Sequence, residues 1–164
     1  MLWPEIDVDK RVWRIDAERT KNGLPHDVPL SSLAVEILRR RERSDRALVF
    51  GSREGPFQGW SNAKSALDKR VLAKLREQGA LKPWRLHDIR RTVATRMADL
   101  GVQPHVIEAV LNHISGHKAG VAGVYNRASY ANEKRQALDM WAAHVEALVE
   151  GRESNVIALR GVKC

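Results

Sequence analysis

The residues of this sequence that are best suited to chemistry form two groups in its second half. In the stretch "KPWRLHDIRRTVATRM", His87 precedes Arg90 by three positions at the start of a predicted helix, with a single acid between them. A titratable base one turn from a permanent cation indicates a site for an anionic group. Further along, His113 ends a second predicted helix, and Tyr125 follows after a glycine-rich loop. Such a loop can bring the imidazole of His113 and the phenol of Tyr125 toward one point.

The composition indicates which anion these groups would meet. The chain has 164 residues, of which 43% are hydrophobic, enough for one domain with a core. Its net charge of +8 and pI near 10.1 favour a polyanionic partner, with nucleic acid the leading candidate. The single cysteine, Cys164, excludes an internal disulfide framework and a cysteine-based metal site. Because no apolar run approaches the roughly 20 residues of a membrane span and no signal peptide is recognisable, we expect a cytoplasmic protein.

Most of the positive charge lies in two segments. Residues 36–76 hold 11 Lys and Arg against 5 Asp and Glu, and residues 85–135 hold 8 against 4. Cations of these segments are candidates for contacts with DNA phosphates. The residues that we select as DNA-binding are Lys64, Lys69, Arg70 and Arg91.

A short β region opens the chain and precedes the helices. The pattern of residues predicts two strands, over 12–15 and 28–30. Between them, Asn22 and Gly23 tolerate the positive φ angles of a tight hairpin turn. Residues 47–50, "ALVF", predict a further short, buried strand.

Helical patterns occupy most of the remaining chain. Ser31 or Ser32 can cap a first helix, and Ser129 can cap the last one. A basic amphipathic helix is predicted over residues 61–79, and Pro104 suits the first position of a shorter helix. The apolar residues that should face the core are Ala66, Leu67, Val71, Leu75, Ile89, Val93, Met97, Leu100, Val106, Ile107, Val110, Leu111, Leu138, Trp141, Val145 and Leu148.

The ordered set of these elements resembles the tyrosine recombinases, also called the phage integrase family. The resemblance rests on "LHDIRRT" with His87 and Arg90, on "LNH" with His113, and on "VYNRASY" with Tyr125, together with the hairpin "ERTKNGLPHDVPLS". It spans residues 3–149 and is strongest to prophage-type integrases. H-x-x-R alone is a weak signal, whereas four elements in the family's order are a strong one. The resemblance implies an α+β, mainly α domain of the DNA breaking-rejoining fold with a small antiparallel sheet.

The resemblance also implies a role for each residue. In that family a tyrosine attacks the scissile phosphate, forms a 3′-phosphotyrosyl link and releases a 5′-hydroxyl, without a nucleotide cofactor or metal. Tyr125 matches this nucleophile, Arg90 the clamp on the non-bridging oxygens, and His113 a hydrogen-bond donor to the same phosphate. His87 matches the residue that assists proton transfer, and Lys21 the lysine that protonates the leaving 5′-oxygen.

Each assignment has a structural alternative. Tyr125 could be a core or interface tyrosine, while Tyr130, the other tyrosine, would anchor the final helix. His87 by itself could be a capping or core histidine, and Arg90 a solvated helix charge. Lys21 beside Asn-Gly is ordinary turn chemistry.

Two histidines compete for the phosphate. His117 follows His113 by four residues, a spacing found in zinc sites, but no further Cys, His or acid stands at motif spacing. No metal site is therefore predicted. The loop before Tyr125 is longer than in many relatives, which leaves open whether His113 or His117 faces the phosphate.

The sequence departs from the family at its front. Family members carry a first catalytic arginine just upstream of the segment that "LWPEID" resembles, and here only Met1 and Leu2 precede Trp3. From the resemblance we also expect that the helical domain that clamps the other side of the DNA is not part of this sequence. We therefore expect residues 1–150 to be the C-terminal part of a catalytic domain and residues 151–164 to be a tail. The isolated, N-terminally truncated chain should cleave DNA poorly.

The resemblance thus implies site-specific DNA recombination or integration. The expected partners are double-stranded DNA and other recombinase subunits, with no cofactor, membrane or small-molecule substrate. The main alternative is a non-catalytic DNA-binding remnant that keeps the fold and loses strand cleavage. A third hypothesis is a helical protein-interaction module whose final helix packs on another subunit.

Overall fold

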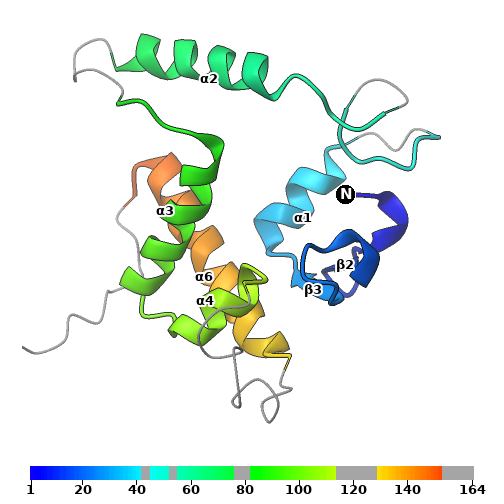
Figure 1. The fold of residues 1–164 in the computed structure, drawn as a ribbon. Coiled ribbons are helices and arrows are strands. Elements are labelled where there is room, and N and C mark those ends of the chain that lie inside the picture. The colour runs from blue at the N-terminus through cyan, green and yellow to red at the C-terminus, as the bar shows by residue number, and fades with distance from the viewer. Residues whose placement is uncertain (42–44, 52–54, 76–81, 114–128, 153–164) are drawn as a thin grey trace, which may run out of the picture.

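The computed structural model describes residues 1–41, 45–51, 55–75, 82–113 and 129–152. In chain order the elements, in which η marks a 3₁₀ helix, are η1 (Trp3–Glu5), β1 (Ile6–Asp7), β2 (Val12–Ile15), η2 (Ala17–Arg19), β3 (His26–Pro29), α1 (Ser32–Arg39), α2 (Trp60–Lys74), α3 (Leu86–Asp99), α4 (Pro104–Val110) and α6 (Ala131–Glu150). The sheet and α1 lie on one side, α3, α4 and α6 lie on the other, and α2 runs along the top of the view (Figure 1). The predicted class, mainly helical with a small antiparallel sheet, is confirmed.

The sheet has three antiparallel strands in the order β1-β2-β3. The first predicted strand is confirmed as β2, whereas the second, β3, covers His26–Pro29 rather than 28–30. The two strands pair from Val12 opposite Pro29 to Ile15 opposite His26. β1 has only two residues and pairs with β2. The sequence analysis missed β1 because so short a segment has no measurable alternation.

The loop between β2 and β3 is longer than predicted. Residues 16–25 include η2, so Asn22 and Gly23 do not form a two-residue hairpin turn. The loop closes on itself: the hydroxyl of Thr20 lies 2.7 Å from the Leu24 carbonyl oxygen, and the Gly23 N–H donates to the Thr20 carbonyl at 3.3 Å. Gly23 takes a φ of +66°, so the prediction was right about its backbone and wrong about the type of turn.

A first core lies between the sheet and α1. Its buried members are Ile6, Leu30, Val35, Leu38 and Val49. Ser31 caps α1 as predicted, since its hydroxyl accepts a hydrogen bond at 3.2 Å from the backbone N–H three residues later. Residues 47–50 contribute Val49 to this core, but instead of the predicted strand they make one isolated bridge, from Leu48 to Leu2.

α6 contacts β3, α1, α3 and α4 and organises the second core. Met97 of α3 and Val106 and Ile107 of α4 are buried, as predicted. On α6 the predicted inward stripe is wrong at Leu148, which is 65% exposed. The buried residues of α6 are Lys134, Ala137, Ala142 and Ala147. Small alanine side chains let helices approach closely, so the larger residues move to the margin of the contact.

The ends of α6 are set by backbone conformation. Tyr130, rather than Ser129, directly precedes the helix, takes a φ of +49° and makes no capping hydrogen bond with its side chain, so the predicted Ser129 cap is wrong. At the other end Gly151 takes a φ of +65° after Glu150. A left-handed glycine is a common helix stop.

α2 is shorter and less covered than predicted. It ends at Lys74 rather than near Gly79, which lies outside the described residues. Leu67 and Leu72 are exposed, and α2 stands apart from the other helices (Figure 1). Ile89, in the first turn of α3, is exposed as well, contrary to its predicted place in the core. On the predicted apolar side of α2, Ala66 and Leu67 are thus exposed, contrary to the prediction, whereas Val71 and Leu75 are partly buried.

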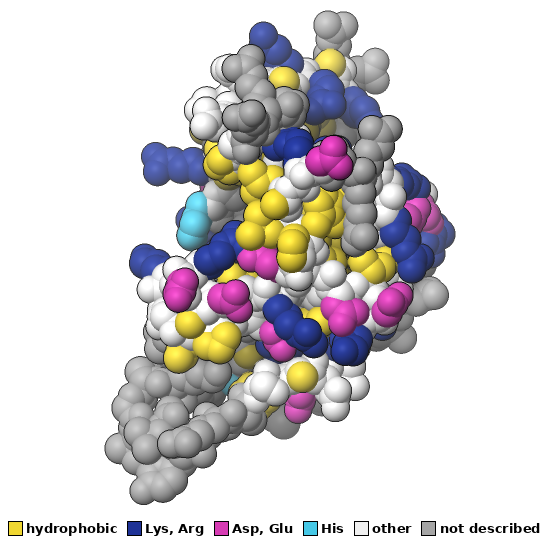
Figure 2. Space-filling view, turned by 90° about the vertical axis from the view of Figure 1, so that its right-hand side faces the viewer, with side chains coloured by type: hydrophobic (Ala, Val, Ile, Leu, Met, Phe, Trp, Pro, Cys, Tyr) yellow, Lys and Arg dark blue, Asp and Glu magenta, His cyan; other side chains and the backbone are white. Residues whose placement is uncertain are grey.

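Exposed aromatic side chains lie before and at the start of α2: Phe50, Phe57 and Trp60. With Met1, Leu48 and Pro56 they line a pocket of about 650 Å³. The rings of Phe57 and Trp60 meet edge to face, with their centroids 4.8 Å apart. Figure 2, which views the molecule from this side, shows hydrophobic side chains grouped between Lys and Arg side chains.

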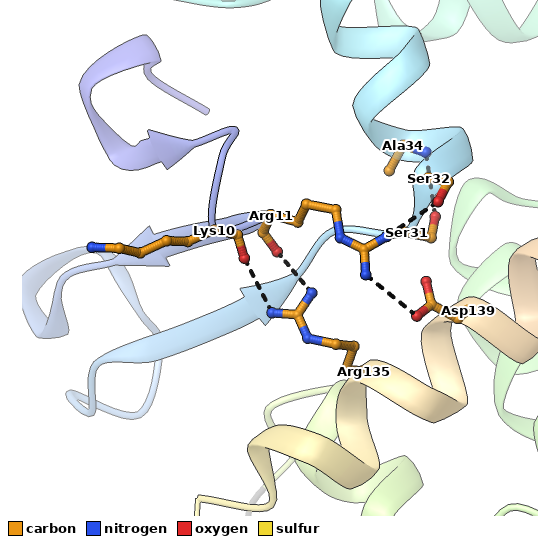
Figure 3. Close-up of polar contacts among 7 residues, drawn as sticks. All are labelled: Lys10, Arg11, Ser31, Ser32, Ala34, Arg135 and Asp139. Carbon is orange, nitrogen blue, oxygen red and sulfur yellow. Dashed lines mark hydrogen bonds and ion pairs between the residues drawn. The ribbon is translucent and has the colours of Figure 1, made fainter.

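Arg135 of α6 links this helix to the sheet (Figure 3). Its guanidinium donates to the Lys10 carbonyl at 3.2 Å and lies 3.5 Å from the Arg11 carbonyl, in the turn between β1 and β2. Arg11, with a φ of +51°, donates in turn to the Ser32 hydroxyl at 3.1 Å and lies 4.0 Å from the Asp139 carboxylate. These contacts orient α6 relative to the sheet and to the start of α1.

Lys134 is a buried charge with a structural role. It is 5% exposed, and its Nζ donates to the carbonyl of Asp27 in β3 at 2.6 Å. We expect Lys134→Ala to lower the free energy of unfolding by about 2 to 3 kcal/mol, because the Asp27 carbonyl loses a charged donor and the packing of a buried side chain is lost. Urea unfolding followed by circular dichroism measures this change. Glu133→Ala, at the exposed preceding position, should change it by less than about 0.5 kcal/mol, and equal losses in the two variants would contradict the prediction.

Candidate active site

The acid between His87 and Arg90 is engaged in starting α3. The Asp88 carboxylate accepts the backbone N–H of Arg85 at 2.8 Å, and the Arg85 carbonyl accepts the N–H of Asp88 at 2.8 Å. These reciprocal bonds cap the helix. The other carboxylate oxygen of Asp88 lies 3.5 Å from the guanidinium of Arg91. Asp88 therefore caps the helix and faces Arg91, not Arg90.

Arg90 reaches from α3 to the end of α4. Its Nη2 donates to the Leu111 carbonyl at 2.5 Å. Leu111 is the C-cap residue directly after α4, where carbonyls lack helical partners and carry partial negative charge. A guanidinium has five N–H donors, so this single bond orients the group and leaves donors for an anionic ligand. The bond also places the Arg90 side chain beside the segment that ends in His113.

The chain leaves α4 in a way that presents His113. Asn112 takes a φ of +51°, and its N–H donates to the Ala109 carbonyl at 3.4 Å. The N–H of His113 donates to the Glu108 carbonyl at 2.9 Å. This pair of bonds is the Schellman arrangement, which usually has glycine at the left-handed position. It ends α4 at Val110, three residues before the predicted helix end at His113, and leaves His113 exposed beyond the helix.

The loop between β2 and β3 brings Lys21 to the same end of α4. Lys21 is exposed at the corner of the turn that Thr20 and Gly23 close. The next residue, Asn22, donates from its side-chain Nδ2 to the Oδ1 of Asn112 at 2.8 Å, across 90 sequence positions. The turn that carries Lys21 is thereby held against the residue that precedes His113.

Residues 111–113 are therefore a junction of three separate elements. Arg90 of α3 binds the carbonyl of the first residue, the Lys21 turn binds the side chain of the second, and His113 is the third. His87 lies one turn before Arg90 on α3 and is exposed. The arrangement puts the Arg90 guanidinium, the His113 imidazole and the turn that carries Lys21 at one end of α4.

A pocket of about 240 Å³ lies at this junction. Its polar lining includes Asn22, His26, Glu108, Asn112, His113 and Ser129. The β2–β3 loop, the end of α4 and the start of α6 meet there. Ser129 follows Tyr125 by four positions in the sequence.

Tyr125 and His117 lie outside the described residues. The convergence of Tyr125 with Arg90 and His113 thus stays a prediction. The choice between His113 and His117 for the phosphate stays open for the same reason.

Three of the four selected DNA-binding residues are exposed. Lys69 and Arg70 lie on α2, and the side chain of Arg91 on α3 is 76% exposed. Exposed cations of this kind can reach DNA phosphates without first breaking a buried interaction within the protein. Their role in DNA binding stays a prediction.

Lys64 has a different environment. Its Nζ lies 2.6 Å from the Asp68 carboxylate and 4.6 Å from the centre of the Trp84 ring. The Trp84 indole N–H in turn donates to Asp68 at 2.9 Å. Lys64 therefore helps to join α2 to the segment that leads into α3, and its charge is partly balanced there.

The sequence analysis missed the two asparagines at the junction. Asn22 was assigned only to a turn, and Asn112 was given no role. A usable signal was present at Asn112, because asparagine close to a predicted helix end is the residue that most often replaces glycine in the left-handed position. Nothing local could indicate its partner 90 positions away.

Among the residues that the structure describes, no group of three or more His, Cys, Asp or Glu side chains is placed to hold a metal ion. In the same part of the chain, no helix is long and apolar enough to cross a membrane.

Comparison with known proteins shows which family shares this sequence. The model of the phage integrase family matches residues 1–131. Prophage integrase IntA of Escherichia coli K12 is 33% identical over 151 residues, covering 91% of this chain and 35% of that protein. Prophage integrase IntS of the same strain is 28% identical over 92% of this chain and 38% of its own, and the integrase of Shigella phage Sf6 is 27% identical over 87% and 36%. The chain thus spans little more than a third of these relatives. No solved structure matches it significantly.

Proposed function

Because the chain belongs to the phage integrase family, we propose that it carries the DNA-cleaving residues of a site-specific tyrosine recombinase. Its substrate is double-stranded DNA at an attachment site, on which it acts with other recombinase subunits. The observation that carries the proposal is the junction at residues 111–113, which brings Arg90, His113 and the Lys21 turn to one end of α4.

In the proposed reaction the phenol oxygen of Tyr125 attacks the scissile phosphorus, and the bond from phosphorus to the 5′-oxygen breaks. The phenol proton passes to a base, for which His87 is the candidate. Lys21 delivers a proton to the departing oxygen, so a 5′-hydroxyl leaves. One phosphodiester is exchanged for another, so the step consumes no nucleotide, and rejoining is its reversal.

Arg90 and His113 stabilise the negative charge that grows on the non-bridging oxygens. Hydrogen-bond donors aimed at these oxygens lower the barrier most when they are oriented before the substrate binds. The bond from Arg90 to the Leu111 carbonyl supplies such an orientation, since it ties the guanidinium to the backbone at the end of α4. A planar fork of N–H groups also matches two phosphate oxygens at once.

Covalent trapping tests the proposal. The protein expressed from the complete reading frame is incubated with nicked duplexes of randomised sequence. The duplexes that form a covalent adduct identify the target sequence. The short strand beyond the cleavage point diffuses away, so the phosphotyrosyl adduct accumulates and is detected on a denaturing gel. We expect an adduct joined to a 3′ DNA end. Binding without any adduct would favour the non-catalytic DNA-binding alternative and reject cleavage.

DNA binding should depend on salt, because each phosphate contact releases counterions. The slope of log affinity against log salt changes by about 0.9 for each contact. Lys69→Ala and Arg70→Ala should each reduce the slope by about that amount, and Lys64→Ala should reduce it less, because Asp68 lies 2.6 Å from its ammonium group. Fluorescence anisotropy of a labelled duplex at several salt concentrations measures these slopes. An affinity that is the same at low and high salt would contradict the electrostatic account.

A further inference from the structure

We propose that Asn22 and Asn112 are positioning residues that hold Lys21 in register with His113 during cleavage. The inference rests on the proposed function, because it gives both amides a task in the same reaction. Neither side chain needs to touch the DNA. Their hydrogen bond sets where the proton donor stands relative to the group that holds the phosphate.

Asn112 occupies a position where helices usually place glycine. Its φ of +51° is strained for most residues, and glycine adopts it freely. Asparagine tolerates the conformation and adds an amide that glycine lacks. That amide is in use, since its oxygen accepts the hydrogen bond from Asn22 at 2.8 Å. The amide of Asn112 thus connects the end of α4 to the β2–β3 loop.

Asn22 uses both ends of its own amide. The oxygen accepts the Leu24 N–H at 3.1 Å, and the nitrogen donates to Asn112. The first bond fixes the amide within the loop, as in an Asx turn. Because the amide is planar and rigid, the corner with Lys21 cannot shift against α4 without breaking a hydrogen bond. The Asn22–Asn112 contact is partly buried, where water competes less.

This connection matters for a proton donor on a long side chain. A general acid must come within hydrogen-bond reach of the leaving oxygen, and a misplacement of about 1 Å can cost about 100-fold in rate. The same end of α4 also holds Arg90 through the Leu111 carbonyl. Loss of the amide pair should therefore impair protonation of the leaving group more than DNA binding or phosphate stabilisation.

Two substrates separate these effects. One nicked duplex has the natural 5′-oxygen at the scissile phosphate, and the other has a 5′-sulfur, which leaves as a thiolate without being protonated. Asn112→Gly removes the amide and keeps the left-handed backbone. It should slow adduct formation by about 10- to 100-fold on the oxygen substrate and by less than about 3-fold on the sulfur substrate. Lys21→Ala should show the same selective rescue.

Asn22→Asp is the conservative control. Its carboxylate still accepts the Leu24 N–H, and it can accept a hydrogen bond from Asn112 once that amide turns over. It should therefore cleave both substrates nearly as well as the wild type. Equal losses on both substrates in Asn112→Gly, or unchanged cleavage of the oxygen substrate, would overturn the inference.

An activity-independent measurement keeps the inference separate from the proposed function. In Asn112→Gly, backbone ¹⁵N relaxation should show lower order parameters for residues 20–24 than in the wild type, since the loop loses its link to α4. Unchanged order parameters there would overturn the inference. If the wild type forms no adduct on either substrate, the proposed function fails, and the relaxation data alone decide whether the amide pair positions the loop.

Discussion

Replacing Tyr125 by phenylalanine is expected to abolish the covalent protein–DNA adduct, because the proposed reaction joins the phenol oxygen to phosphorus. Loss of a nucleophile lowers rates by about 10⁴-fold or more, which takes the adduct to background. Duplex affinity should change by less than about 2-fold, since the substitution removes no positive charge. The adduct is quantified on denaturing gels over time, and affinity is measured by anisotropy on the same preparation.

Tyr130 is the matched control, because the chain has two tyrosines. Its ring lies 5.0 Å from the ring of His105, just before α6. Tyr130→Phe keeps this ring contact and should keep the adduct. An adduct that survives in Tyr125→Phe and disappears in Tyr130→Phe would move the nucleophile to Tyr130 and contradict the assignment.

Arg90→Lys should lower the rate of adduct formation by about 10³-fold at saturating DNA, although it preserves the positive charge. Lysine is a point charge that lacks the planar fork, so it cannot bind two phosphate oxygens in parallel. It also cannot hold the Leu111 carbonyl and the phosphate with one rigid group. Single-turnover trapping on nicked duplex measures the rate of the chemical step separately from DNA binding.

Arg91→Lys is the neighbouring control for this prediction. Arg91 is on the same helix, and its exposed side chain pairs with Asp88 at 3.5 Å. Its substitution should change the rate by only a few-fold. If Arg91→Lys loses as much rate as Arg90→Lys, the clamp has been assigned to the wrong arginine.

Arg90→Lys should also affect folding stability. Loss of the exposed bond from Arg90 to Leu111 should cost about 1 kcal/mol of folding stability, which thermal unfolding can verify.

The elements themselves were largely predictable because their signals are local. The strand over Val12–Ile15, the Ser31 cap, the start of α4 at Pro104 and the burial of Met97 all follow from side chains within a few positions of one another. Each of these features depends on the backbone geometry of one or two turns. The order of residue types along the chain is enough to predict such local geometry.

The faces that elements present to one another were less predictable. α6 buries alanines and Lys134 where a stripe with Leu148 was expected, and α2 leaves Leu67 exposed. Periodicity identifies an apolar side of a helix, but the neighbour that covers it depends on how all elements pack. The β2–β3 loop is a further case. A hydrogen bond from Thr20 to the Leu24 carbonyl closes the loop, where a tight hairpin turn was predicted.

The same division holds at the candidate site. The sequence by itself determined the residue types and their order: His87 and Arg90 at a helix start, and His113 at a helix end. Only the tertiary structure decided that Asp88 caps α3, that Arg90 binds the Leu111 carbonyl, and that Asn22 meets Asn112 across 90 positions. A helix start and a helix end are local events. Contacts between distant side chains exist only once the packing of whole elements has set their separation.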